Sequence, residues 1–443
     1  MTITIRPRER DAILQSLRAG VVPRIGLQHI QVGRKDEIAA ILNDLDSIAQ
    51  GGTAVRFVIG RYGSGKSFFL NLARMLALEK KFVVVQADIS PERRLHASGG
   101  QARSLYSELM KNMSAGAKRD GGALPSLVEK WVSDVEFNVR QTDGDLNQAI
   151  YTSLKPLQDY ISGYDFATVI SKYVEGFEKG DDALMTAALR WLRAEYATKM
   201  EARQDLGVRS IIGDQDVYEY LKLMAAFVHL AGYSGLLVNL DEMGVLSHRL
   251  NNTPARNANY EMILHIVNDC LQGSVIGLGV IFAGINDFMD DRRRGIASYE
   301  ALRRRLADNA FAVGGLKDYS GPVIRLQNLT PEDLYVLLLN IRHVYAAGDA
   351  LSYIVPDEAI NAYIQHCART LGAEFYQTPG DAVKGFVGFL SVLGQNPGTD
   401  WQTLLSGIKI QPSINPESLS MTENETQMPA TNSGQDELTT FRL

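Results

Sequence analysis

The chain has 443 residues, of which 45% are hydrophobic and 22% are charged, and its formal net charge is -6. This composition is typical of a globular protein of two or three domains and excludes a fibrous or wholly disordered one. The acidic balance also excludes a protein that coats nucleic acid over its whole surface, so any DNA contact requires a local basic patch.

Signals for targeting and for cysteine chemistry are weak. The longest apolar stretch, residues 275–285, is too short to span a membrane, and the first ten residues are too charged for a signal peptide. We therefore expect a cytoplasmic protein without a membrane partner. Cys270 and Cys367 lie in helical patterns without metal-ligand spacing, so we expect buried thiols.

The pattern of the first half of the chain predicts two helices, then two strands and then a long helical stretch. Residues 8–18 predict a helix that ends at Gly20, and residues 38–48 predict a second helix closed by two glycines. Apolar runs at residues 55–59 and 82–86 predict strands. Residues 91–230 have a helical pattern almost throughout and predict an insertion, either a bundle that adds stability or a surface for a partner.

The second half returns to strands and ends in helices. Buried strands are predicted at residues 236–242, 280–283 and 323–326, before a helix that Thr330 caps with Pro331 at its first position and Asp333 completing a capping box. Helical periodicity continues to about residue 406 and predicts a small lid. Residues 411–443 are polar and predict a mostly disordered tail, whose last eight residues are amphipathic and either dock on a neighbour or fray.

The first predicted strand leads directly into the sequence Gly-Arg-Tyr-Gly-Ser-Gly-Lys-Ser at residues 60–67. Glycines let the backbone N–H groups turn toward phosphate oxygens, and the following helix adds its positive N-terminal end. Lys66 suits the β and γ phosphates, and the Ser67 hydroxyl suits Mg²⁺. We therefore predict that ATP binds at Gly60, Gly63, Ser64, Gly65, Lys66, Ser67 and Phe68.

Polar residues follow two later strands. Asp241 and Glu242 end the third predicted strand, where the carboxylates suit the Mg²⁺ shell and activation of the attacking water; the alternative is the start of a solvated loop. Asn286 follows the fourth strand and is predicted to contact the γ-phosphate or orient the water, the alternative being a turn residue.

Two basic clusters follow Asn286. In the first, Asp291 and Gly295 flank three arginines, which predict at most contact with a DNA backbone because few aromatic residues lie nearby. In the second, Arg303, Arg304 and Arg305 lie on a short helix. One of them is expected to reach a neighbouring subunit's nucleotide, and the alternative is a solvated basic face.

Together these segments resemble AAA+ ATPases of the origin-recognition type. The resemblance implies that residues 31–34, which include Gly33 and Arg34, lie on the adenine side of the nucleotide. The resemblance sharpens to the BREX phage-defence P-loop ATPases of the BrxD type at residues 17–23, 63–70, 188–193, 206–212 and 232–238. It implies an ATPase with ATP and Mg²⁺ as cofactors, working with other BREX-type defence proteins. The family tends to place a lid arginine after a Thr-Pro pair. Here Thr378 and Pro379 precede Gly380, with Lys384 one turn on.

We therefore expect an α/β fold with an AAA+ (ASCE) P-loop core, a five-stranded parallel sheet, a large helical insertion and a helical lid. The expected division is residues 1–52 for the N-terminal helices and adenine-side segment, 53–327 for the core, 328–410 for the lid and 411–443 for the tail.

The expected function is ATP hydrolysis by a homo-oligomer that couples nucleotide state to remodelling of DNA or a partner during phage defence. Gly380 favours an alternative, a scaffold that hydrolyses ATP slowly and recruits effectors. A replication-initiator-like DNA binder is a third hypothesis, but residues 411–443 are too short and polar for the winged-helix domain it requires.

Overall fold

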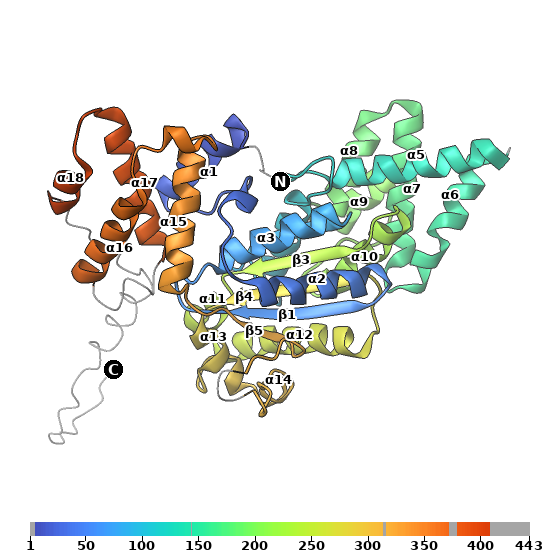
Figure 1. Cartoon of the computed structure of the whole chain (residues 1–443). Coiled ribbons are helices and arrows are strands. Elements are labelled where there is room, and N and C mark those ends of the chain that lie inside the picture. Colours follow the sequence, from blue (N-terminus) through green and yellow to red (C-terminus); the bar gives the residue numbers. More distant parts are fainter. Residues whose placement is uncertain (1–4, 143, 313–315, 372–378, 408–443) are drawn as a thin grey trace, which may run out of the picture.

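The computed structural model describes residues 5–142, 144–312, 316–371 and 379–407 (Figure 1). At its centre is one sheet of five strands in the order β2-β3-β4-β1-β5, all parallel, as the sequence predicts. The carboxyl ends of all five strands therefore meet at one edge. The strands are β1 (Thr53–Ile59), β2 (Val83–Asp88), β3 (Leu236–Asp241), β4 (Leu278–Gly284) and β5 (Val323–Arg325).

Helices cover both faces of the sheet, which is why its strands are nearly continuous apolar runs. Val58 packs toward α2 (Lys35–Ala49) and α3 (Lys66–Glu79), whereas its neighbours in β1 pack toward the opposite face. Because successive side chains of a strand point to opposite faces of the sheet, the same short strand contributes side chains to the hydrophobic cores on both faces. The opposite face is covered by α4 (Gln101–Lys111), α10 (Val217–Leu230) and α12 (Thr253–Gln272).

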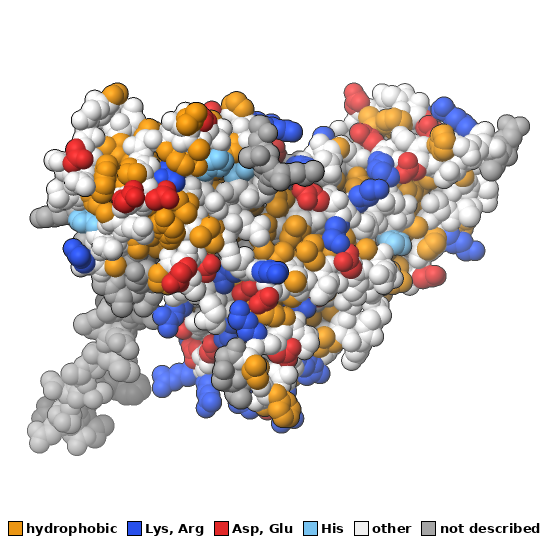
Figure 2. Space-filling view, viewed as in Figure 1, with side chains coloured by type: hydrophobic (Ala, Val, Ile, Leu, Met, Phe, Trp, Pro, Cys, Tyr) orange, Lys and Arg blue, Asp and Glu red, His pale blue; other side chains and the backbone are white. Residues whose placement is uncertain are grey.

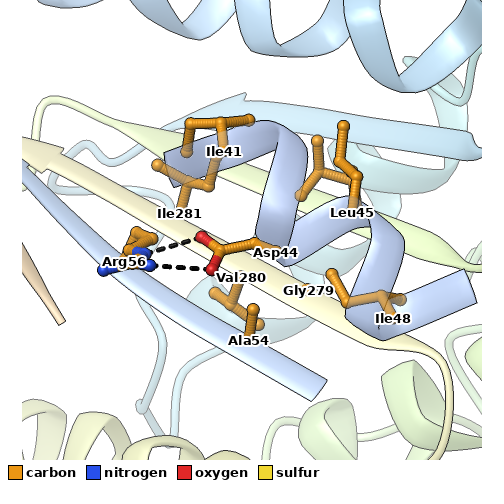
Figure 3. A pocket seen from close by; sticks show the side chains of 10 residues that line it. Ile41, Asp44, Leu45, Ile48, Ala54, Arg56, Gly279, Val280 and Ile281 are labelled. Atoms are coloured by element: carbon orange, nitrogen blue, oxygen red, sulfur yellow. Dashed lines mark hydrogen bonds and ion pairs between the residues drawn. The ribbon is translucent and has the colours of Figure 1, made fainter. Parts of the chain in front are cut away.

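An ion pair fastens α2 to the sheet (Figure 3). The Arg56 guanidinium donates from Nε and Nη2 to both carboxylate oxygens of Asp44, at 2.6 and 2.7 Å. The arginine also donates to the carbonyl oxygens of Tyr319 and Gly321. Beside this pair lies a cavity of about 10 Å³, lined mostly by apolar side chains. Room for one water molecule at most is far too little for a nucleotide.

Seven α-helices lie between β2 and β3, in the stretch where the sequence predicts them. Their core is aromatic: the Phe227 ring lies 5.6 Å from Trp131 and 5.9 Å from Phe166, both in edge-to-face geometry. This core is continuous with that of the sheet, so the insertion extends the sheet's own interior. Besides α4 and α10, the helices are α5 (Leu124–Thr142), α6 (Leu146–Leu154), α7 (Gly163–Lys179), α8 (Asp182–Leu192) and α9 (Lys199–Leu206).

Short helices follow β3 and β4. They are α11 (Gly244–His248), α13 (Asn286–Asp290) and α14 (Glu300–Arg305). The two after β4, α13 and α14, lie at the lower edge of the molecule in Figure 1. These two helices lie in the connection from β4 to β5, and the one after β3 leads to α12.

A separate helical core lies beside the carboxyl edge of the sheet (Figure 1). The N-terminal helix α1 (Pro7–Ala19) belongs to it and packs on two of its helices. We call α1 and the four C-terminal helices the helical body, and the remainder the sheet body. The C-terminal helices are α15 (Pro331–Tyr345), α16 (Asp357–Leu371), α17 (Pro379–Gln395) and α18 (Trp401–Gly407).

Local signals in the helical body match the sequence. The helix α1 ends at Gly20 in the left-handed conformation, with φ 75°. Thr330 and Asp333 form the expected capping box, with Pro331 at the first position of α15. Both cysteines are buried free thiols, as predicted. The predicted tail, residues 411–443, lies outside the described residues. Among the described helices none has the length and apolar content needed to cross a bilayer.

Candidate functional site

The loop between β1 and α3 is tightly constrained by its glycines. Gly63 has φ 74° and Gly65 has φ 88°, both in the left-handed region. A β-carbon at Gly60 would lie 2.4 Å from the Ser64 hydroxyl oxygen and 3.2 Å from the Leu326 carbonyl oxygen, so only glycine fits there. Since α3 begins at Lys66, the backbone curls directly onto a helix N-terminus. This is the arrangement by which backbone N–H groups bind phosphate.

Lys66 reaches back across the loop that precedes it. Its ammonium donates to the carbonyl oxygens of Gly60 at 3.1 Å and Arg61 at 3.0 Å. These contacts hold a positive charge at the mouth of the loop. A phosphate oxygen there is the partner that such an ammonium binds in phosphate-binding loops.

Ser67 and Asp241 meet across the carboxyl edge of the sheet. The Ser67 hydroxyl donates to Asp241 Oδ2 at 2.7 Å, although 174 positions separate the two residues. Asp241 ends β3, and β4 lies between that strand and β1. A hydroxyl and a carboxylate are oxygen donors of the type that Mg²⁺ prefers. The two motifs predicted from the sequence therefore lie together.

Glu242 lies at a turn in the backbone. It has φ 58°, which is uncommon for a residue with a β-carbon. Its N–H donates to Asp241 Oδ1 at 2.8 Å, and the next N–H, that of Met243, donates to the Ala283 carbonyl in β4. The left-handed turn is how two adjacent carboxylates lie at one edge instead of on opposite faces of the sheet.

Asn286 begins α13 directly after β4 and is half-buried. Gly284, two residues before it, accepts a hydrogen bond from the Gly60 N–H at 3.2 Å and pairs with Ile59 in the sheet. Asn286 thus follows β4, the strand between β1 and β3, and lies at the same edge of the sheet as the loop between β1 and α3.

Arg34 links three segments. Its Nη2 donates to the Ser64 carbonyl in the loop at 3.0 Å and to the Gln327 carbonyl after β5, and its Nη1 lies 3.6 Å from Glu37 Oε1. Burial lowers the pKa of Arg34, and the charge of Glu37 opposes that shift. Gly33 has φ 64°, and a β-carbon there would lie 3.4 Å from Asp333 Oδ1. Both residues therefore sit where the two bodies join.

Phe68 is the apolar counterpart of that link. It follows Ser67 in α3, yet its half-buried side chain packs against the core of the helical body. The helix that begins at Lys66 is thus in direct contact with both bodies.

The arginine clusters lie apart from this loop. Arg303 and Arg304 both pair with Glu300 on their own helix and remain 52% and 78% exposed. Arg305 donates to Asn268 Oδ1 at 2.6 Å. Figure 2 shows Lys and Arg side chains mixed with Asp and Glu along the lower edge, where Figure 1 places α13 and α14.

The first cluster is partly structural. Arg294 donates to the His248 carbonyl at 3.1 Å and to Asn251 Oδ1 at 2.9 Å, which fixes the loop after α11. Arg292 and Arg293 are exposed.

In the helical body, Gly380 lies in the first turn of α17, and Thr378 lies outside the described residues. The exposed Lys384 has its side-chain stem 3.9 Å from a β-carbon built on Gly20, at the end of α1.

The chain as a whole matches one known family. The family described as BREX system ATP-binding protein BrxC/D matches residues 5–409. The chain belongs to this family. Among curated proteins no match is found. The matched range includes both bodies and the whole insertion, so the BREX ATP-binding family accounts for nearly every described element.

One carboxylate at this edge of the sheet in the BREX family chain was not predicted from the sequence. Asp88 ends β2 and pairs in register with Asp241. Burial raises the pKa of Asp88, and the negative charge of Asp241 raises it further. The signal was present, because a carboxylate directly after a buried strand lies at the carboxyl edge of a parallel sheet.

Proposed function

We propose that the protein binds ATP with Mg²⁺ and hydrolyses it as an AAA+ ATPase of a BREX defence system. The observation that carries this proposal is the 2.7 Å contact between the Ser67 hydroxyl and Asp241, which unites the phosphate-binding loop with the acidic end of β3. The strand order supports the AAA+ assignment, because β4 is inserted between β1 and β3 and a helical body follows β5.

Each site residue has a role in this proposal. Lys66 and the loop N–H groups of Gly63 and Gly65 bind the phosphates, whereas the N–H groups of Gly60 and Ser64 donate to the carbonyls of Gly284 and Arg61 and hold the loop in shape. Ser67 and Asp241 hold Mg²⁺, which neutralises charge on the transferred phosphoryl group. Glu242 accepts a proton from the attacking water, and Asn286 orients that water or contacts the γ-phosphate.

Arg34 and Phe68 give the nucleotide a route to the helical body. Arg34 holds the loop carbonyl of Ser64 and the chain after β5 with one guanidinium, and Phe68 packs into the helical core. A phosphate that shifts the loop or α3 therefore shifts both contacts. We infer that the helical body acts as the lid, and that its position reports which nucleotide is bound.

Oligomerisation and DNA contact are the further parts of the proposal. Arg303 and Arg304 are exposed and their only partner among the described residues is Glu300, so either can exchange that carboxylate for a neighbouring subunit's nucleotide. Arg292 and Arg293 offer contacts to phosphate backbones. Partner proteins of the defence system would bind the oligomer that forms in this way.

A slowly hydrolysing scaffold is the second candidate. Gly380 favours it, because no side chain projects from the position at which the family tends to carry a lid arginine. A scaffold holds ATP for many minutes without DNA stimulation, whereas a motor cycles faster when DNA or a partner is added. Single-turnover and steady-state phosphate release, each with and without duplex DNA, separate the two.

The decisive variant is Glu242→Gln. It retains the shape of the site and removes the base, so we expect ATP binding within about twofold of the natural chain and turnover lowered about 100- to 10,000-fold. Phosphate release measures turnover, and calorimetry measures binding. Lys66→Ala is the matched comparison, because it should lose binding as well. Undiminished hydrolysis by Glu242→Gln would show that another group activates the water.

A further inference from the structure

One arginine joins three segments at the carboxyl edge of the sheet. Arg325 ends β5, and its guanidinium binds both carboxylate oxygens of Asp290, from Nη1 at 3.0 Å and from Nη2 at 2.9 Å. The Nε donates to Asp308 Oδ2 at 3.2 Å, and Nη2 lies 3.1 Å from the same oxygen. All three nitrogens of this guanidinium therefore have a carboxylate partner. A bidentate pair of this kind fixes the relative direction of the two groups as well as their distance.

The first of these carboxylates belongs to the helix that Asn286 begins. Asp290 ends α13, one helical turn after Asn286, the residue proposed to orient the attacking water or to contact the γ-phosphate. Because α13 has only five residues, a contact that fixes its last residue also constrains the position of its first. Arg325 thus holds α13 from the end opposite Asn286.

The second carboxylate follows the helix of exposed arginines. Asp308 lies three residues after Arg305, which ends α14. This helix carries Arg303 and Arg304, the two arginines proposed to reach a neighbouring subunit. The guanidinium of Arg325 is therefore shared between the helix after β4 and the segment after α14.

The place of Arg325 in the sheet puts this link beside the phosphate-binding loop. The strand β1 lies between β5 and β4, and Arg325 pairs in register with Ile59, the last residue of β1. The N–H of Leu326 donates to the Ile59 carbonyl at 2.7 Å. Because α13 follows β4, the ion pair between Arg325 and Asp290 joins the elements on either side of β1. These elements are thus held together across the end of the strand that leads into the loop.

We propose that Arg325 is a positioning residue for ATP hydrolysis, which ties Asn286 to the arginine helix α14 through Asp290 and Asp308. This role rests on the proposed ATPase function and adds one residue to it. Contact of Asn286 with the γ-phosphate or the attacking water shifts α13, and the shared guanidinium carries the shift to α14. The water-orienting amide and the arginines offered to a neighbouring subunit are then set together when ATP is bound.

Steady-state phosphate release by Arg325→Met tests this role. A misplaced Asn286 slows the chemical step without weakening phosphate binding by the loop, so kcat should fall about 10- to 100-fold while KM changes less than about twofold. Arg325→Lys keeps the charge but loses the planar fork, and so it should recover part of kcat. An unchanged kcat in Arg325→Met would overturn the proposal.

Arg190→Met is the matched control. Arg190 of α8 also pairs with two carboxylates, Glu201 at 2.8 Å and Asp205 at 3.8 Å, and its side chain is 38% exposed against 34% for Arg325. Each of the two variants should lower the unfolding temperature by less than about 4 °C, since partly exposed ion pairs contribute little stability. Only Arg325→Met should slow turnover. Equal losses of kcat in both variants would reveal a general effect of destabilisation and overturn the proposal.

A second background shows whether Arg325 acts through Asn286. Once Asn286→Ala has removed the amide, Arg325→Met should lower kcat further by about threefold or less, because the effects of residues that act as a unit do not add. A further fall as large as that in the natural chain would mean that Arg325 acts independently of Asn286, contrary to the proposal.

Hydrogen exchange separates failure of this role from failure of the proposed ATPase. A slowly hydrolysed ATP analogue should slow amide exchange at residues 60–67 in both the natural chain and Arg325→Met, but at α14 in the natural chain alone. Equal slowing at α14 in both chains would overturn the role of Arg325 and leave ATP binding intact. No slowing at residues 60–67 in the natural chain would overturn ATP binding, and this role with it.

Discussion

The first two helices of the chain, α1 and α2, are separated by only fifteen residues, yet they belong to different cores. Ile13 of α1 is fully buried among the helices of the C-terminal part, whereas Ile41 of α2 is buried against the sheet. Both helices have one apolar face. The difference teaches that an apolar face shows that a helix is buried against another element. The path of the chain between the helices determines which body that element belongs to.

The chain therefore crosses between the two bodies twice, once before the strands of the sheet and once after them in the sequence. The first crossing lies at residues 30–34 and the second at residues 326–331. Arg34 binds the backbone at the second crossing and in the phosphate-binding loop. A motion of the helical body therefore pulls on the loop through both connections.

Each body carries one buried thiol, which makes the comparison measurable. Cys270 lies in the core of the sheet body and Cys367 in that of the helical body. Labelling of each cysteine, followed by mass spectrometry, reports the opening of its own body.

The largest expected effect comes from Ile13→Ala. Removing a fully buried side chain should cost about 4 kcal/mol of stability, because the cavity between α1 and α17 cannot close completely. Labelling of Cys367 should accelerate strongly while Cys270 keeps its rate. Ile41→Ala is the matched variant and should show the opposite preference. Equal acceleration at both cysteines in either variant would show that the two cores open as one.

Asp44→Ala should have the next largest effect, about 3 kcal/mol. It leaves Arg56 buried beside two carbonyl oxygens but without its carboxylate, at the lower end of the cost of breaking a buried ion pair. Urea denaturation measures the loss, and faster labelling should appear at Cys270. A double variant with Arg56→Met should recover part of the stability. No recovery would contradict the view that the unpaired cation is the cause.

Arg34→Lys should lower the free energy that couples ATP binding to the position of the helical body by about 1–2 kcal/mol. Lysine keeps the positive charge and the left-handed backbone strain at φ 61° but cannot reach the two carbonyls with one planar group. ATP should protect Cys367 from labelling less than in the natural chain, with the affinity for ATP changed less than tenfold. Arg34→Gly relieves the strain and removes the contacts, and so it should lose the protection as well. Full protection in both would assign the coupling to Phe68 alone.

The smallest effect is one of pH. Burial raises the pKa of Cys270 to about 12 and that of Cys367 to about 11, so neither thiol forms its reactive anion in the folded chain near neutrality. Labelling should then proceed through opened molecules and level off above pH ~8.5, the pKa of an exposed thiol. Rates that keep rising to pH 10 would reveal direct reaction of a folded thiolate.

Local chemistry made much of the sheet body predictable. A buried run of residues followed by a glycine-rich loop predicts β1 and α3 by itself, and the same holds for the carboxylates that end β3. Proximity of Ser67 to Asp241 followed from the rule that parallel strands share one carboxyl edge. The pairing of Glu300 with Arg303 and Arg304 is also of the kind that a sequence can predict, because residues three and four positions apart lie on one face of a helix.

Other features depend on contacts that no local pattern encodes. The helical stripe of Ile13 and Leu14 predicts an apolar face without naming its partner. The left-handed backbone of Arg34 and Glu242 is set by the surrounding turns, since neither residue type favours it. The predicted boundaries at residues 52 and 327 stay predictions, and the cores add that α1 packs with α15 and α17, which follow the whole sheet in the sequence.

The packing of α1 also sets the order in which this protein can be completed during its synthesis. The helix leaves the ribosome before its partner α17 (Pro379–Gln395), which follows on the order of tens of seconds later. Until α15 and α17 are made, the apolar stripe of α1 has no native surface to cover it. The nascent chain therefore exposes an apolar segment for as long as the synthesis of these partners takes, and such a segment is a target for chaperones.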